Sequence, residues 1–214
     1  WARGPLLPPR DLYVRLLQSA GHIVVAAHYD TAADSPGATD NASGTAVVLE
    51  LCELFARQAQ TDLGKSRLGI DFIAYGAEEY GRHGRHYGHG DNKGSAEYVR
   101  RHPDRVREAR AVVEADCVGT ALVSPRLWHV TGWTSRQKED ILSVMRRFPR
   151  LIIEDSPARA PGPFHLPGVP ALTFVNDFER LHIHTAQDTI DLMSPGELAF
   201  IAEVIAAAVD HLST

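Results

Sequence analysis

The amino-acid sequence predicts an α/β protein whose largely parallel β-sheet is covered by helices on both faces. Short runs of β-favouring apolar residues alternate with amphipathic stretches of helical period along most of the chain. Polar motifs follow directly after several of these runs, at the sheet edge where such folds bind ligands. With 214 residues, 44% of them hydrophobic, the chain can build one substantial core, so we expect a single domain over residues 1–214.

Each element follows from a local pattern. Residues 10–19 place three leucines at helical spacing and predict a first helix. Residues 22–27 are almost continuously apolar and predict a strand that is buried on both faces. A turn-forming stretch over 31–40 precedes a predicted amphipathic helix over 41–57. Further strands are predicted at 68–75, 111–115, 127–130, 151–154 and 171–175, and further helices at 135–147 and 194–212.

The composition excludes several classes of protein. A net charge of −5 argues against nucleic-acid binding, which needs clustered excess Lys and Arg. No apolar run reaches the roughly 20 residues that cross a bilayer, so no membrane association is expected. The two cysteines leave the compartment open. Since the chain begins at Trp1, with no initiator Met or signal peptide, we expect the natural N-terminus to lie upstream, and the localisation stays unknown, either cytoplasmic or secreted.

Histidines and carboxylates gather where the predicted strands end. Each has an ordinary alternative, because a lone Asp before a helix is usually a cap and paired glutamates usually line a solvated edge. Two histidines and three carboxylates at the ends of successive strands, however, form a ligand set that suits zinc. The candidates are His28, Asp40, one of the pair Glu78-Glu79, Asp116 and His184.

Six segments resemble the co-catalytic dizinc aminopeptidases, a family that includes bacterial leucyl aminopeptidases. They are HYDT from His28, GATDNASG around Asp40, GAEEYG around the pair Glu78-Glu79, EADCVG around Asp116, GVPAL from Gly168 and HTAQDT from His184. Their order and spacing agree from about residue 22 to the C-terminus. The resemblance implies a three-layer α/β/α sandwich with a central mixed, mostly parallel sheet.

The resemblance also implies how a metal centre is divided among these residues. His28 and Asp116 hold one zinc, Glu79 and His184 hold the second, and Asp40 bridges the two. A pair of metals of this kind binds one water and polarises the scissile carbonyl. We therefore expect two Zn²⁺ per chain, although cobalt or manganese suits the same ligands.

Four further features are implied around that centre. Glu78 is the general base that takes the proton of the dizinc-bridged water and passes it to the leaving amine. Asp30 orients the ligand His28. Asp188 either supports His184 in the same way or is a turn residue. A cis peptide bond is expected between Asp40 and Asn41.

The sequence departs from the family in two places. Where many relatives carry a Ser-Asp-His segment, in some preceded by an oxyanion-stabilising tyrosine, residues 156–161 place Ser156 at the tyrosine-like position and Ala160 at the Asp-like one. Arg159 or His165 are possible substitutes. The second departure is a Gly/His-rich insertion over 81–94, read either as a surface loop or as a lid or extra metal site.

The leading function is a zinc exopeptidase that removes N-terminal amino acids from peptides, with a peptide or amino-acid amide as substrate. A glutaminyl cyclase is the first alternative, disfavoured by the full ligand set and by Ala160. A non-catalytic peptide-binding domain like that of transferrin receptor is the second. A carboxypeptidase or another amide hydrolase on the same scaffold stays open, as do the side-chain specificity and the oligomeric state.

Overall fold

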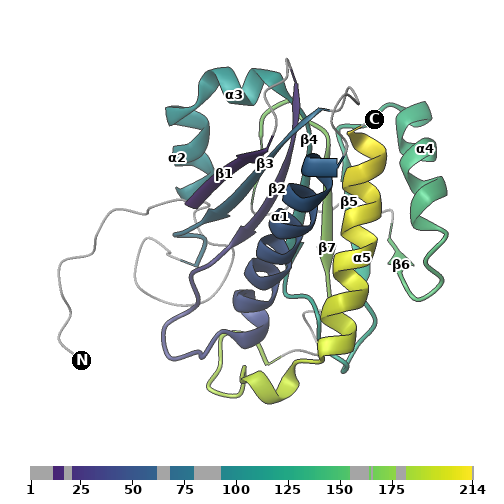
Figure 1. Ribbon diagram of the computed structural model, residues 1–214. Coiled ribbons are helices and arrows are strands. Elements are labelled where there is room, and N and C mark those ends of the chain that lie inside the picture. The colour runs from purple at the N-terminus through teal and green to yellow at the C-terminus, as the bar shows by residue number, and fades with distance from the viewer. Residues whose placement is uncertain are drawn as a thin grey trace.

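The computed structural model describes residues 12–16, 21–61, 68–79, 93–154, 164, 166–176 and 182–213. Its strands form one seven-stranded sheet in the order β1-β3-β2-β4-β7-β5-β6 (Figure 1). Strands β3, β2, β4 and β7 run parallel to one another, whereas β1 and β5 are antiparallel to their neighbours β3 and β7. The strands are β1 (Leu12–Leu16), β2 (His22–His28), β3 (Gly69–Tyr75), β4 (Ala109–Asp116), β5 (Arg126–Thr131), β6 (Ile152–Ile153) and β7 (Ala171–Val175).

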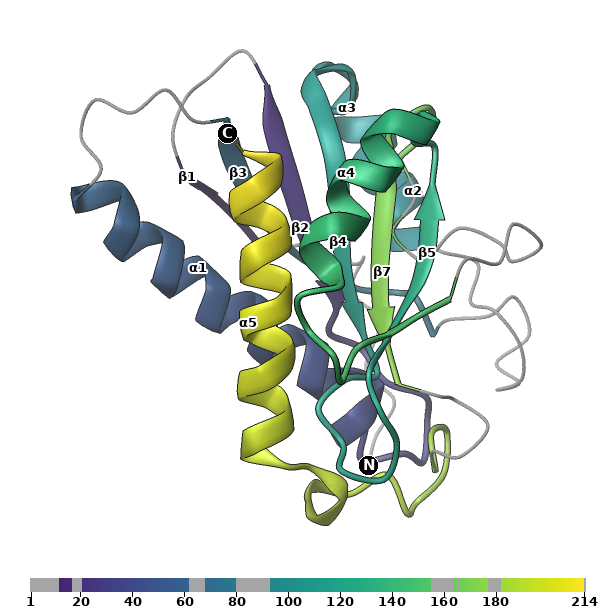
Figure 2. The ribbon, with the colours of Figure 1, turned by 90° about the vertical axis from the view of Figure 1, so that its right-hand side faces the viewer.

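Helices cover both faces of this sheet. Helices α1, α4 and α5 pack on one face around a large apolar core, and α2 and α3 pack on the other around a smaller one (Figure 2). The expected three-layer α/β/α sandwich with a mixed, mostly parallel sheet is therefore confirmed. The helices are α1 (Gly44–Thr61), α2 (Lys93–Arg101), α3 (Pro103–Glu108), α4 (Ser135–Met145) and α5 (Pro195–Leu212).

The central position of β2 and β3 in the sheet explains why their sequences are apolar without alternation. Every residue of β2 and of β3 is buried, because helices lie over both faces and strands lie on both sides. The apolar face of α1 packs on the same core through Val47, Val48, Leu51 and Phe55. At the start of α5 the Ser194 hydroxyl accepts a hydrogen bond from the Glu197 N–H, which caps the helix.

The predicted helix over residues 10–19 is wrong. Residues Leu12–Leu16 form β1, which pairs with β3 in antiparallel register, with Leu12 opposite Ala74. The same stretch also alternates apolar residues with a period of two, and a helix of this length is marginal by itself. The edge of β3 opposite β2 offers backbone hydrogen-bond partners to an extended segment, and pairing with this edge favours the strand over the helix.

Two helices and both ends of α1 were also missed, because α1 runs over Gly44–Thr61 and not over the predicted 41–57. No helix was predicted at α2 or α3, where apolar positions are sparse. Helix α1 begins at Gly44 rather than 41, because the irregular turn Ala38–Ser43 precedes it. None of the helices within the described residues combines the length and the apolar character that a membrane span requires.

Candidate metal centre

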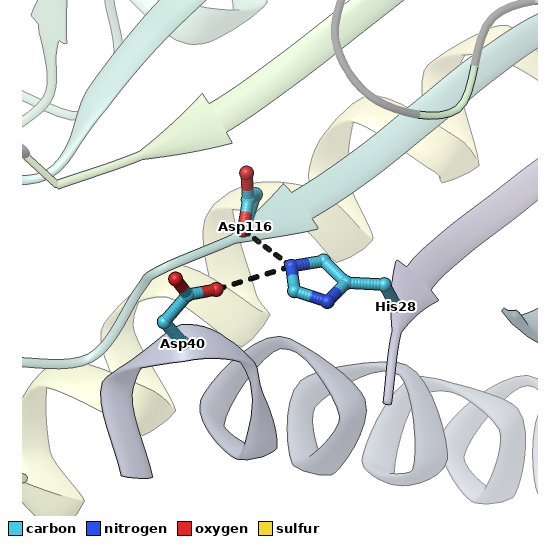
Figure 3. A group of neighbouring side chains, drawn as sticks. All are labelled: His28, Asp40 and Asp116. Atoms are coloured by element: carbon cyan, nitrogen blue, oxygen red, sulfur yellow. Dashed lines mark hydrogen bonds and ion pairs between the residues drawn. The ribbon is translucent and has the colours of Figure 1, made fainter. Parts of the chain in front are cut away.

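Three of the predicted ligands meet at the carboxyl edge of the sheet. His28 is the last residue of β2, Asp116 is the last residue of β4, and Asp40 lies in the turn that leads into α1 (Figure 3). The His28 Nε2 lies 3.2 Å from an oxygen of Asp40 and 3.2 Å from an oxygen of Asp116. All three side chains are buried, so this is a compact group that can hold a metal ion.

A second group shares Asp40 with the first. The His184 Nε2 lies 2.9 Å from Asp40 Oδ2 and 2.8 Å from Glu79 Oε1. Asp40 faces His28 with its other oxygen, Oδ1. Within each group the potential ligand atoms lie within 4.8 Å of one another. The structure thus brings together all five predicted ligands, in two triads joined by one carboxylate.

The turn that carries Asp40 is fixed to β4 by its neighbour Asn41. The Asn41 amide donates to the Ala115 carbonyl oxygen (3.0 Å). Its side-chain oxygen accepts from the N–H groups of Gly44 (2.9 Å) and Cys117 (3.1 Å). Gly44 has no room for a side chain, because a Cβ would meet the Ala115 oxygen. The expected cis peptide bond between Asp40 and Asn41 is present.

Asp30 joins the first triad to the pair of glutamates. Its backbone oxygen lies 3.1 Å from His28 Nδ1, and its carboxylate lies 3.6 Å from the same nitrogen. The carboxylate also accepts hydrogen bonds from the backbone N–H groups of Glu78 (3.3 Å) and Glu79 (3.0 Å). Asp30 therefore contacts the His28 ring and sets the backbone from which both glutamates project.

Asp188 lies in a turn, which is one of the two readings considered for it, and its carboxylate makes contacts that were not predicted. Its carboxylate accepts from the backbone N–H groups of Thr39 (2.8 Å) and Asp40 (3.0 Å). The turn of His184 is thereby linked to the turn of Asp40. The side chain of Asp188 supports the segment of Asp40, rather than the ring of His184.

Without a cation, protons on the histidines offset the charge of the cluster. Hydrogen bonds to Asp40 and Glu79 raise the pKa of His184 to about 10. Burial acts to lower the pKa of His28, but the carboxylates around it, led by Asp116, raise it well above its ordinary value. Burial acts to raise the pKa of Asp40, but the hydrogen bonds from the two histidines hold it well below its ordinary value.

The pKa values of the two glutamates are raised, in contrast to that of Asp40. Burial raises the pKa of Glu78 to about 8, and the charges of the neighbouring carboxylates add to this rise. Burial also raises the pKa of Glu79, which His184 opposes. The donor set fits a zinc centre, because a divalent cation can replace the protons that the imidazoles and carboxylates otherwise need.

One buried carboxylate next to this centre was not predicted. Glu114 lies on β4 two residues before Asp116 and is fully buried. It accepts hydrogen bonds from the Tyr75 hydroxyl (2.7 Å), the Phe164 N–H (2.8 Å) and, at 3.3 Å, the Thr173 hydroxyl. Burial raises the pKa of Glu114 to about 7. Its signal in the sequence was a charged residue inside an otherwise apolar strand.

Some predictions fall outside the described residues. These are residues 81–92 of the insertion and the stretch 156–161 with its substitutes Arg159 and His165. Gly94, at the end of the insertion, lies in helix α2. The roles that the resemblance implies for the ligands, for Glu78 and for Asp30 stay predictions.

Comparisons with known proteins show which proteins this chain is similar to in sequence and in fold. The chain is 29% identical over 199 residues to Aminopeptidase YwaD of Bacillus subtilis, covering 87% of this chain and 40% of that protein. The structure of BSAP, a zinc aminopeptidase from Bacillus subtilis, superposes with a TM-score of 0.72 at 25% identity, over 95% of this chain and 50% of that one. The glutaminyl cyclase of Porphyromonas gingivalis, with a TM-score of 0.74, 21% identity and coverage of 97% and 78%, shares the fold.

The chain spans half or less of the length of these two aminopeptidase matches. The similarity to one protein family nevertheless covers every strand of the described sheet. Residues 12–209 match Peptidase family M28, and the chain belongs to that family.

Proposed function

We propose that this protein is a zinc-dependent exopeptidase that removes N-terminal amino acids from peptides. The observation that carries the proposal is the shared carboxylate of Asp40, whose two oxygens face two different histidines. Such an arrangement suits two cations side by side. The similarity to BSAP, which is named as a zinc aminopeptidase, supports zinc as the metal.

In this proposal each triad holds one Zn²⁺. His28 and Asp116 bind the first, Glu79 and His184 bind the second, and Asp40 contributes to both. Bound zinc supplies Lewis acidity, which makes a water more acidic and polarises a carbonyl. The three ligand carboxylates offset most of the charge of two divalent cations, as a stable centre requires.

Glu78 is proposed as the general base, and Asp30 positions it. Glu78 is next to the ligand Glu79 but lies in neither triad. A carboxylate that takes a proton from the attacking water and gives it to the leaving amine needs a raised pKa, near the working pH. Burial supplies such a shift, and Asp30 fixes the backbone N–H of Glu78.

The charge of the site favours an amino-terminal substrate. When it is ionised, Glu78 places a negative charge beside the two triads without ligating either metal, and this carboxylate can attract the ammonium group of a peptide N-terminus. That preference points to an aminopeptidase rather than a carboxypeptidase. The substrate is a peptide or an amino-acid amide.

The test is amine release from a panel of aminoacyl-nitroanilides by the zinc-loaded protein. We expect hydrolysis that a chelator abolishes and that Glu78→Gln lowers by about 10²- to 10⁴-fold while zinc content is kept. Glu203→Gln, at an exposed position on α5, is the matched control and should keep full activity. Cyclisation of an N-terminal Gln peptide without nitroanilide hydrolysis would instead identify a glutaminyl cyclase.

A further inference from the structure

Asp188 is a buried carboxylate whose two oxygens both face backbone donors. Its side chain is completely buried. Oδ1 accepts from the Thr39 N–H and Oδ2 from the Asp40 N–H, at 2.8 and 3.0 Å. The Asp188 backbone oxygen accepts a third hydrogen bond, from the Ala38 N–H (3.1 Å). Three consecutive N–H groups of the Asp40 turn therefore donate hydrogen bonds to Asp188.

These contacts call for a carboxylate and not merely a side chain of that size. An ionised carboxylate only accepts hydrogen bonds and can serve two N–H groups at once. The amide of Asn has the same shape but presents an NH₂ donor in place of one oxygen. In Asp188→Asn, one backbone N–H would face a donor, and the turn would have to move or leave that group unpaired.

The position of Asp188 links two segments that carry ligands. Asp188 is four residues after His184, whose backbone lies in the left-handed region with φ 59°. A non-glycine residue in that region is strained and needs its surroundings to hold it there. The Asp188 N–H donates to the Thr185 oxygen (3.2 Å), which closes the turn after His184. The same residue thus fixes the turn of His184 and the turn of Asp40.

We propose that Asp188 is a positioning residue that sets the distance between Asp40 and His184 and thereby the zinc affinity of their shared triad. The inference rests on the proposed function, because it assumes that this triad holds a metal. Partners that orient metal ligands from behind contribute about 10- to 100-fold to metal affinity. Asp30 plays the matching part at Glu78 and Glu79, again through two consecutive N–H groups.

The test is zinc affinity, measured at 25 °C on metal-free protein in competition with a chromophoric chelator. Circular dichroism first establishes that each variant is folded at that temperature. We expect Asp188→Asn to bind at least one of the two zincs about 10- to 100-fold more weakly than the wild type. Asp191→Asn makes the same change at an exposed position three residues further on and should bind zinc as the wild type does.

The other outcomes separate the inference from the proposal beneath it. Wild-type affinity for both zincs in a less stable Asp188→Asn would overturn the inference alone, since a merely structural residue lowers the melting temperature without changing metal binding. Absence of zinc binding by the wild type would overturn the proposed function and the inference with it. Should Asp188→Asn not fold, Asp188→Glu, which moves the carboxylate by one methylene, is measured instead. Weakened zinc binding supports the inference, and wild-type affinity refutes it.

Discussion

Replacing the proposed base should stabilise the metal-free protein. Burial raises the pKa of Glu78 from 4.5 to about 8, so at neutral pH the folded chain must keep a proton there that the unfolded chain releases. Glutamine has no proton to keep and has nearly the same shape. Glu78→Gln should therefore lose activity and gain stability at once, as expected where a residue is placed for function at a cost to the fold.

The size of the effect follows from that pKa. Each unit of difference between folded and unfolded pKa corresponds to about 1.4 kcal/mol. At pH 7 the pH lies 2.5 units above the ordinary pKa of 4.5, so keeping Glu78 protonated in the folded chain costs roughly 3 kcal/mol. Because the side chain is partly exposed, solvent screening reduces this cost to about 2 kcal/mol. For a chain of this length that is a rise of roughly 4–8 °C in melting temperature.

The sign of the pH dependence is fixed by the direction of the shift. Between pH 4.5 and 8 the folded state binds the proton of Glu78 and the unfolded state does not, so this group makes stability fall as the pH rises. The advantage of Glu78→Gln should be absent near pH 4.5 and grow towards pH 8. Urea unfolding in excess chelator at several pH values measures it, with Glu203→Gln as the exposed control. A variant no more stable than the wild type at pH 7–8 would refute the reasoning.

Three further predictions concern the metal and the packing around it. Chelation should lower the melting temperature, because zinc at 100 times its dissociation constant contributes about 2.7 kcal/mol per site; calorimetry with zinc added back checks this. Gly44→Ala should cost about 1–3 kcal/mol in urea unfolding, because its Cβ would meet the Ala115 oxygen. Tyr75→Phe removes the hydroxyl that donates to Glu114 and should cost about 1–3 kcal/mol, with zinc affinity unchanged in a chelator competition.

Those parts of the fold and site that depend on local pattern could be predicted from the sequence. The apolar run of β2 and the amphipathic face of α1 identified both elements, and the polar residues after the strands identified the candidate ligands that the structure brings together. His28 and Asp116 lie in neighbouring parallel strands, whose carboxyl ends must meet at one edge. For that reason the predicted proximity of His28 and Asp116 is a contact in the structure.

Features that depend on pairing between distant segments could not be predicted. The stretch 10–19 fits a helix and a strand about equally, and the free edge of β3 decides between them. The carboxylate of Asp188 contacts backbone groups nearly 150 residues away, and backbone N–H groups leave no mark in the sequence. Glu114 is likewise paired by residues of β3 and β7 that only the folded sheet brings beside it.

Anomalous X-ray diffraction at the zinc absorption edge, on crystals of the zinc-loaded protein, tests the proposed metal centre most directly. The account predicts two peaks per chain. One should lie between His28, Asp40 and Asp116, and the other between Asp40, Glu79 and His184. A single peak, or peaks that do not contact Asp40, would contradict the shared carboxylate on which the proposed function is built.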